Sequence, residues 1–441
     1  MRHTLSGVNP STPGPSVSVE GADPAARTLP HAEPPRYPSE SAPLPVQSPV
    51  PGLLPGSLPE RLFAELVSFR RDVHMHPELG RQEFRTTGLI KARLEASGLE
   101  PRVLPGGTGL LCDIGPQDTG RPRLALRADI DALPIPDTKT VGYRSTVPGR
   151  AHACGHDVHT TVVLGAGLVL AELARDGLLS RPVRLVFQPA EEMMPGGALD
   201  VIKAGGLDGV DRILALHCDP KVEVGRIGLR QGAITSACDR LELSLDGPGG
   251  HTARPHLTTD LVTAAARLAV DLPAVLARRV DPRAGLSLVW GRIQSGHACN
   301  VVPQHAELEG TVRCLEHEAW REAPDLVHEV IDQVTSMYGA KWELTYHRGV
   351  PPVVNEADSV ELLRAAMGAR YGGHTVEDTE QSLGGEDFSW YLEQVPGALA
   401  RLGVRPPHES TGRDLHRGDF DVDERAIAVG VELFTAASLL D

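Results

Sequence analysis

The 441-residue sequence has no C-x-x-C pair, few aromatic residues and no excess of positive charge. Its six cysteines lie far apart, which indicates reduced thiols, one of which can serve as a ligand, rather than a disulfide framework. Aromatic residues make up only 4% of the chain, so platforms for stacking bases or sugars are not expected. The formal net charge of −15 argues against a nucleic acid or an anionic membrane as partner, because binding phosphate requires a basic surface.

Long hydrophobic runs are missing as well. The longest, residues 162–171, is far shorter than the ~18 residues that a membrane span requires. The N-terminus lacks the charged and then apolar pattern of a signal peptide. These two absences predict a cytoplasmic protein. The remaining composition, with 41% hydrophobic and 23% charged residues, is ordinary for a globular protein, and the length allows two or three domains.

The apolar pattern divides the chain into three parts. Residues 1–56 hold 13 of the 37 prolines and no periodic apolar pattern, which predicts disorder. Strand-like and helix-like segments alternate in residues 57–234 and again in 347–441, which is typical of an α/β domain with a mainly parallel sheet flanked by helices. Residues 235–346 combine half-exposed strands with two helices and predict an inserted α+β layer.

The start of the ordered part carries a helix signal. Ser57 and Glu60 have the spacing of a capping box, and apolar residues follow at helical spacing. The first helix is therefore expected to begin at this box.

Side chains that bind metals or move protons are concentrated in the segment AHACGHDVHT, residues 151–160. Similar groups follow three predicted strands: Asp129 after RLALRA, Glu191 and Glu192 after RLVFQPA, and His217 after RILAL. The carboxyl ends of parallel strands meet at one edge of an open α/β sheet, where ligands bind. The sequence therefore predicts that these four segments converge on one site.

The chemistry of this set favours a transition-metal site. Cys, His and carboxylate are ligands of zinc and its neighbours, and Cys154 and His156 lie two residues apart on one loop. The adjacent pair Glu191 and Glu192 suits a division of labour in which one carboxylate binds metal and the other holds a proton. A metal lowers the pKa of a bound water toward ~7, so the set is typical of a hydrolase.

Other interpretations of these residues stay open at this point. A Cys nucleophile with a His base is the main rival, although the segment has no G-x-C-x-G elbow and leaves the Glu pair without a role. Taken singly, a His, a Cys or a Glu pair is ordinary in a core or on a surface. His152, Asp157 and His159 can orient ligands or begin a helix, and Asp157 can be a helix cap alone.

Ten motifs in order make the chain from about Leu58 onward resemble the M20 metallopeptidase superfamily. The closest likeness is to its branch of N-acyl-amino-acid amidohydrolases, which includes hippurate hydrolases and auxin-conjugate hydrolases. The motifs are HMHPELGRQE, RADIDALPI, HACGHDVHT, PAEE, ALHCDP, GPGGHTARPH, ACNVVP, GTVR, GGEDFS and LHRGDF. Arg127 stands where the peptidase branches carry a His, which together with His156 places the chain in the amidohydrolase branch.

This resemblance implies a site for two divalent metal ions, with Zn, Mn, Co and Ni all compatible. Glu191 would be the general base, and Asp129 would support the metal site from behind its ligands. The implied ligands are Cys154, which would bridge the ions, His156, Glu192, His217 and His416.

The resemblance also gives roles to the inserted layer. It would be a lid or dimerisation domain, and the remainder, 57–234 with 347–441, would be the metal-binding catalytic domain. His251 would stabilise the oxyanion, reaching the site of the partner subunit in a homodimer. Asn300 and Arg313 would grip the substrate carboxylate or the intermediate, although turn and ion-pair roles are common for such residues.

The predicted function is metal-dependent hydrolysis of the amide bond of N-acyl amino acids, giving a carboxylate and a free amino acid. The alternatives are a dipeptidase or carboxypeptidase with the same two-metal centre, and a metal-free scaffold. The sequence names neither the acyl group, nor the amino acid, nor the physiological metal.

Overall fold

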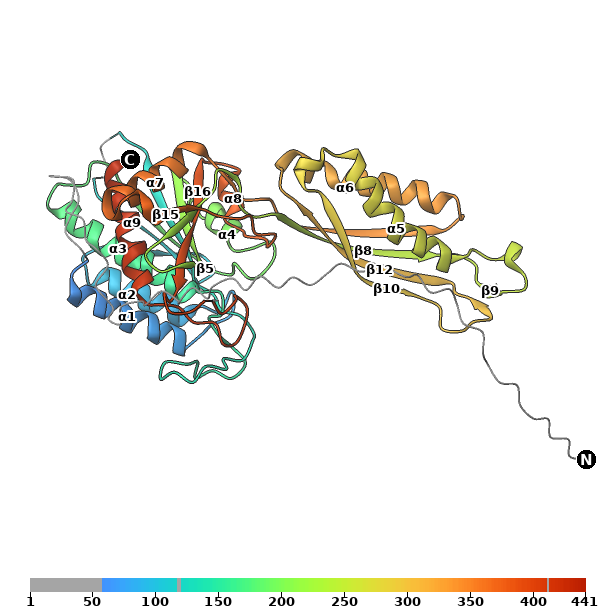
Figure 1. The fold of residues 1–441 in the computed structure, drawn as a ribbon, viewed down its shortest axis with the longest axis horizontal. Helices are drawn as coiled ribbons and strands as arrows, with labels where there is room; N and C mark the ends of the chain where they lie inside the picture. Colours follow the sequence, from blue (N-terminus) through green and yellow to red (C-terminus); the bar gives the residue numbers. More distant parts are fainter. Residues whose placement is uncertain (1–57, 117–119, 411) are drawn as a thin grey trace, which may run out of the picture. The chain divides into compact units, whose positions relative to one another are not determined.

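The computed structural model describes residues 58–441 except 117–119 and 411 (Figure 1). The segment 1–56, predicted to be disordered, lies outside the described residues, and so does Ser57 of the expected capping box. Helix α1, Glu60–Met75, has Pro59 at its N-cap position and no side-chain cap. Proline is well suited to a helix start because its φ is fixed near the helical value and no amide hydrogen is needed there.

A central sheet of eight strands positions the rest of this domain. Its order is β1-β2-β4-β3-β5-β16-β6-β15, and β4, β3, β5 and β16 run parallel at its centre. The mainly parallel α/β fold predicted from the sequence is thus confirmed. The strands are β1 Arg102–Val103, β2 Leu110–Ile114, β3 Arg123–Asp129, β4 Val183–Gln188, β5 Val210–Glu223, β6 Ile227–Leu229, β15 Val376–Asp378 and β16 Gly397–Arg405.

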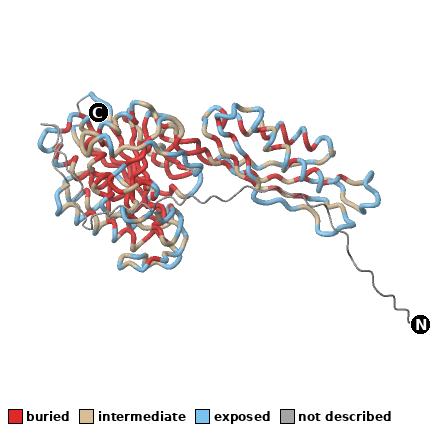
Figure 2. The backbone as a smooth tube through the Cα atoms, viewed as in Figure 1, coloured by how far each residue is buried: buried red, intermediate tan, exposed pale blue. Residues whose placement is uncertain are grey.

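Helices cover both faces of this sheet, which is why its strands read as continuous apolar runs. One face packs against α1, α2, α3, α7 and α9 through residues such as Leu126 and Leu214, and the other against α4 and α8 through Val186 and Ile213. Figure 2 shows the buried residues gathered in this sheet. The further helices are α2 Phe84–Glu95, α3 His156–Arg175, α4 Ala198–Lys203, α7 Ala357–Tyr371, α8 Ser389–Leu392 and α9 Arg425–Leu440.

Helix α3 is the most deeply buried of these. By length and composition it is the one helix in the described part of the chain that could cross a membrane. However, 83% of its most apolar stretch is buried inside the protein, and the helix packs against α1, α9 and the sheet. Gly155 precedes it with a left-handed φ of 88°, and a Cβ there would lie 2.8 Å from the Cys218 sulfur. Only glycine fits this position, which lies between Cys154 and His156.

The inserted layer forms a separate four-stranded antiparallel sheet in the order β10-β12-β8-β13, with α5 and α6 packed on it around their own apolar core. Strand β13 pairs with β8 as far as Val350, so this layer runs past the predicted boundary at 346. We call residues 237–350 the inserted domain. Its main elements are β8 Ala237–Asp246, α5 Leu261–Arg279, β10 Ser287–Ser295, β12 His305–Cys314, α6 His317–Ser336 and β13 Lys341–Val350.

Short elements complete the described chain. Strands β9 and β11 pair within the inserted domain, and β7 pairs with β14. Their bounds, with those of the three 3-10 helices, are β7 Gly232–Ala233, β9 Gly250–His251, η1 Pro255–Leu257, η2 Pro282–Ala284, β11 Val301–Val302, β14 Val354–Asn355 and η3 Gly373–Thr375.

Candidate metal centre

The structure brings the five residues predicted as metal ligands together at the carboxyl edge of the parallel strands. Cys154 precedes α3, His156 is its first residue, and Glu192 follows β4. His217 lies within β5, and His416 lies in the segment between β16 and α9. The structure corrects one local detail, since His156, expected on a loop with Cys154, is already the first residue of α3.

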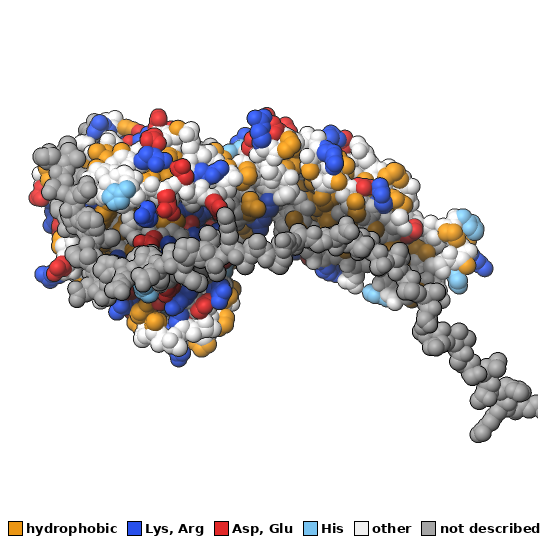
Figure 3. Space-filling view, in the orientation of Figure 1, with side chains coloured by type: hydrophobic (Ala, Val, Ile, Leu, Met, Phe, Trp, Pro, Cys, Tyr) orange, Lys and Arg blue, Asp and Glu red, His pale blue; other side chains and the backbone are white. Residues whose placement is uncertain are grey.

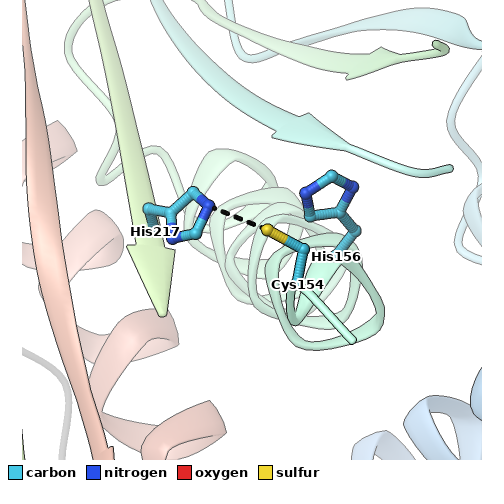
Figure 4. A group of neighbouring side chains, drawn as sticks. All are labelled: Cys154, His156 and His217. Carbon is cyan, nitrogen blue, oxygen red and sulfur yellow. Dashed lines mark hydrogen bonds between the residues drawn. The ribbon is translucent and has the colours of Figure 1, made fainter. Parts of the chain in front are cut away.

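Cys154, His156 and His217 form the first group. Their ligand atoms all lie within 4.8 Å of one another, and Cys154 Sγ is 3.4 Å from His217 Nε2. Figure 4 shows the thiol of Cys154 between the two imidazole rings, with His217 reaching it from strand β5.

Cys154, Glu192 and His416 form a second group of the same kind. His416 Nε2 lies 3.3 Å from Cys154 Sγ and 3.4 Å from Glu192 Oε1. The backbone amide of His416 donates to the Ala153 carbonyl oxygen at 2.8 Å, which ties the C-terminal segment to the loop that carries Cys154. The Cys154 sulfur therefore belongs to both groups.

The imidazole orientations fit a pair of metal ions. His217 Nδ1 lies 2.9 Å from the Cys218 carbonyl oxygen, and His156 Nδ1 lies 3.0 Å from that of Asp131, so both rings donate from Nδ1. Each Nε2 can then offer its lone pair to a cation of the cluster once it has lost its proton. His156 Nε2 and Glu192 Oε1 are buried without a hydrogen-bond partner, as expected for atoms that coordinate a cation.

The electrostatics of the cluster also favour a bound cation. Burial raises the pKa of the Cys154 thiol well above its ordinary value, and the carboxylates of Glu192 and Glu191 raise it further. Burial lowers the pKa of His156, but Asp129 and its other carboxylate neighbours outweigh this and raise it to about 10. Divalent cations would stabilise the thiolate and the carboxylates together.

Glu191 lies beside both groups. Its Oε2 is 3.9 Å from His156 Nε2, and its ligand atom lies within 4.8 Å of those of His156 and Glu192. Glu191 also forms an acidic group with Glu386 and Asp387. Burial, followed by the charges of Glu386 and Glu192, raises the pKa of Glu191 well above its ordinary value. A carboxyl group with a raised pKa suits a residue that must hold and release a proton.

Asp131 is a site residue that the sequence reasoning missed. Its carboxylate accepts hydrogen bonds from the backbone amides of Glu191 at 3.1 Å and Glu192 at 3.0 Å. Its Oδ1 is also 3.3 Å from His156 Nδ1. The motif RADIDALPI contains both Asp129 and Asp131, and the second aspartate of this motif could have identified Asp131 as a site residue.

Asp129, predicted to lie behind the ligands, belongs to a buried charge network. Its Oδ1 is 2.6 Å from His159 Nδ1, and its Oδ2 is 2.6 Å from Arg127 Nη1 and 3.8 Å from His156 Nε2. Arg127 also reaches Glu386 at 3.0 Å and Asp387 at 2.8 Å. The motif GGEDFS, which carries the last two residues, was thus informative beyond its use for the resemblance.

The three other ionisable residues of the segment 151–160, His152, Asp157 and His159, are all buried. Asp157 is not a helix cap, because it is fully buried and pairs with Arg70 at 2.6 Å and His74 at 2.8 Å. His159 donates a hydrogen bond to Asp129 and accepts one from the backbone amide of Cys218 at 2.8 Å, so it orients these two residues. His152 is buried, and neither ring nitrogen has a hydrogen-bond partner.

The three predicted substrate residues lie in the inserted domain. His251 on β9 is exposed, and its Nδ1 accepts the amide of Ala253 at 3.0 Å. Asn300 immediately precedes β11, the strand that pairs with β9. Arg313 on β12 is half-buried and donates to the Leu383 carbonyl oxygen at 2.6 Å. Among the described residues, no hydrogen bond or ion pair joins these three to the metal-ligand groups.

Replacing Asp131 by alanine is expected to weaken metal binding by about 10- to 100-fold, the usual cost of losing a partner that orients ligands. The change removes the acceptor of two backbone amides and the Oδ1 neighbour of His156 Nδ1. Metal content measured after dialysis against graded chelator tests this. Asp200→Ala, at an exposed carboxylate, is the control. Wild-type metal retention in Asp131→Ala would contradict the role of Asp131.

Comparison with protein families gives a match to the model of peptidase family M20/M25/M40 over residues 125–439, which span the ligand groups and the inserted domain. The chain belongs to this family. The M20 membership predicted from the ten motifs is confirmed.

Individual relatives match a larger share of the chain. N-acetyl-L-cysteine deacetylase of Bacillus subtilis (strain 168) is 39% identical over 83% of this chain and 85% of its own length. A dinuclear metal binding peptidase of the M20 family from Bacillus subtilis is 32% identical, with a TM-score of 0.75 over 87% of this chain and 99% of its own.

One further relative is larger. A protein of Rhodococcus jostii (strain RHA1) named putative glutamate–cysteine ligase 2-3 is 49% identical over 86% of this chain, but this chain spans only 47% of that protein.

Proposed function

We propose that this M20 protein is a metal-dependent amidohydrolase that cleaves the amide bond of N-acyl amino acids to a carboxylate and a free amino acid. The observation that carries the proposal is the pair of ligand groups that share Cys154, with Glu191 beside them. The similarity to a Bacillus subtilis deacetylase of an N-acetyl amino acid supports the same reaction class.

The residues present fit two divalent metal ions. In hydrolases such ions polarise the scissile carbonyl and activate water. Zn, Mn, Co and Ni all suit this mixture of thiolate, imidazole and carboxylate, so we propose one of these four. The residues that would hold the ions are Cys154, His156, Glu192, His217 and His416.

Glu191 carries the proton transfer in the proposed reaction. Its carboxylate takes a proton from the attacking water and delivers it to the nitrogen of the leaving amine. Burial and neighbouring carboxylates raise its pKa, which favours keeping the proton until the amine departs. Asp131 fixes the backbone of Glu191 through its amide hydrogen bond and so positions the base.

The inserted domain supplies substrate contacts in this proposal. His251 stabilises the developing oxyanion, and Asn300 and Arg313 bind the substrate carboxylate or the intermediate. The three side chains lie outside the buried core, and a guanidinium suits bidentate contact with a carboxylate.

We also propose that the protein is a cytoplasmic homodimer that associates through the inserted domain. Edge strand β10 exposes Val289 to 63% and Ile293 to 47%, and an exposed apolar edge strand is a ready pairing surface. Figure 3 shows hydrophobic side chains at the surface of this domain. Sedimentation of the full chain tests this, because a monomer of 47.1 kDa at micromolar concentration would contradict it.

A substrate panel tests the function. Protein reconstituted with each of the four metals is expected to hydrolyse N-acetyl and N-benzoyl amino acids with higher kcat/KM than dipeptides. A preference for dipeptides would favour the peptidase alternative. No hydrolysis by any metal-loaded form would contradict the proposal.

A further inference from the structure

Arg401 is a buried cation in the middle of an apolar strand. Strand β16 has the sequence GALARLGVR, and its other residues before Arg405 are glycine or aliphatic. The exposed fraction of Arg401 is 7%. Arginine stays charged in proteins, so this strand carries a full positive charge into the interior.

The strand register places Arg401 beside the metal-ligand groups. Arg401 pairs with His217 of the parallel strand β5, and with Gly228 of β6 on its other side. Residues in register on neighbouring strands project from the same face of a sheet. Burial lowers the pKa of His217 well below its ordinary value, and the charge of Arg401 is among the neighbours that lower it further.

Arg401 forms no ion pair with a carboxylate of the described residues. No carboxylate there lies within 4.0 Å of its guanidinium, and no hydrogen bond from it is formed. Burial lowers the pKa of Arg401, and three acidic side chains raise it by their charge without pairing with it: Asp219, Glu386 and Cys154. Glu386 accepts hydrogen bonds from Arg127 and from the Phe388 amide, and Asp219 accepts one from the Lys221 amide.

The other buried arginines of the described chain show how unusual this is. Each of them has a carboxylate within ion-pair distance, because an unpaired buried charge is costly. These paired arginines are Arg70, Arg127, Arg181 and Arg184.

We propose that Arg401 binds a carboxylate of the substrate in the active site and thereby determines specificity. The inference rests on the proposed amidohydrolase function. An unpaired guanidinium next to the ligand strand is a ready receptor for carboxylate, which it holds through two parallel hydrogen bonds. The carboxylate comes from one of three sources: the α-carboxylate, an acidic side chain of the amino acid, or an acidic acyl group.

Three substrates separate these sources in the metal-loaded full chain. N-acetylalanine has the α-carboxylate alone, N-acetylaspartate adds an acidic side chain, and N-succinylalanine adds an acidic acyl group. Arg401→Met is expected to raise KM about tenfold or more, with kcat within twofold, for the substrates whose carboxylate Arg401 binds. An equal rise for all three identifies the α-carboxylate. A rise for one alone identifies its additional carboxylate. Arg401→Lys is expected to recover part of the loss.

Stability provides the matched control. Arg184→Met removes a buried arginine that pairs with Asp113, so it is expected to lower the unfolding midpoint and leave KM unchanged. Arg401→Met removes an unpaired charge and is expected to keep or raise the midpoint. A folded Arg401→Met with wild-type KM for all three substrates overturns the proposal, and so does a loss of kcat at unchanged KM.

Binding measurements separate this proposal from the proposed function. Calorimetric titration of alanine, aspartate and succinate into the wild type and Arg401→Met requires no turnover. A wild type that hydrolyses no substrate, yet binds one of these carboxylates at least tenfold more tightly than Arg401→Met, would contradict the proposed amidohydrolase function. The same result would support carboxylate binding by Arg401. Equal binding to both proteins would overturn the Arg401 site.

Discussion

Glu191→Gln is expected to lower kcat by about 10²- to 10⁴-fold, the usual contribution of a general acid–base group. Glutamine keeps the size of the side chain but cannot accept the proton of the attacking water. Metal content is expected to stay at the wild-type level, because Glu191 belongs to neither of the two groups that share Cys154, although its carboxylate lies within 4.8 Å of the ligand atoms of His156 and Glu192. Turnover of N-acyl amino acids and elemental analysis of the same sample test both parts.

Glu192→Gln is the matched control, since the two glutamates are adjacent in the chain. Glu192 lies with Cys154 and His416, so its change is expected to lower metal content as well as activity. A Glu191→Gln variant that turns over within a few-fold of wild type would remove Glu191 from the mechanism. Loss of metal in both variants would make Glu191 a ligand instead.

Cys154→Ala is expected to abolish metal binding at both positions and all activity with it. The sulfur lies 3.4 Å from His217 Nε2 and 3.3 Å from His416 Nε2, so its loss removes a donor from both groups. Structural and catalytic zinc sites rarely function with fewer than three protein ligands. Metal stoichiometry after gel filtration and the hydrolysis rate check this expectation.

Cys112→Ala is the control for this change, because Cys112 is also buried but lies on β2, outside the ligand groups. The experiment also separates the metal centre from a Cys nucleophile. An inactive Cys154→Ala variant that still holds two metal ions would favour the nucleophile, as would inactivation of the wild type by thiol alkylation without metal loss.

The parallel sheet and the clustering of the ligand-type side chains could be predicted from the sequence for a physical reason. Strands buried on both faces give continuous apolar runs such as RLALRA and RLVFQ, and functional groups follow directly where these runs end. Glu192 and His217 were therefore recognisable as members of one site. His416 came from the family resemblance, because it lies in a segment without strand or helix pattern.

Contacts between distant segments were not predictable from local patterns. Asp157 has the position of a helix cap in the sequence, but Arg70 arrives from α1 and makes it part of a buried ion pair. The helix does begin at Glu60 of the expected capping box, whose Ser57 lies outside the described residues. Arg401 carries no motif at all. Its environment exists only because β16 lies next to β5.

The hydrogen bond from His416 to Ala153 has a consequence for how the nascent chain matures. One group of ligands is complete once residues 154–217 have emerged from the ribosome, whereas the other must wait for a segment synthesised after the whole inserted domain. We therefore expect that a first ion can be captured before the inserted domain is made, and a second only after His416 has been made. Metal loading would then follow the direction of synthesis.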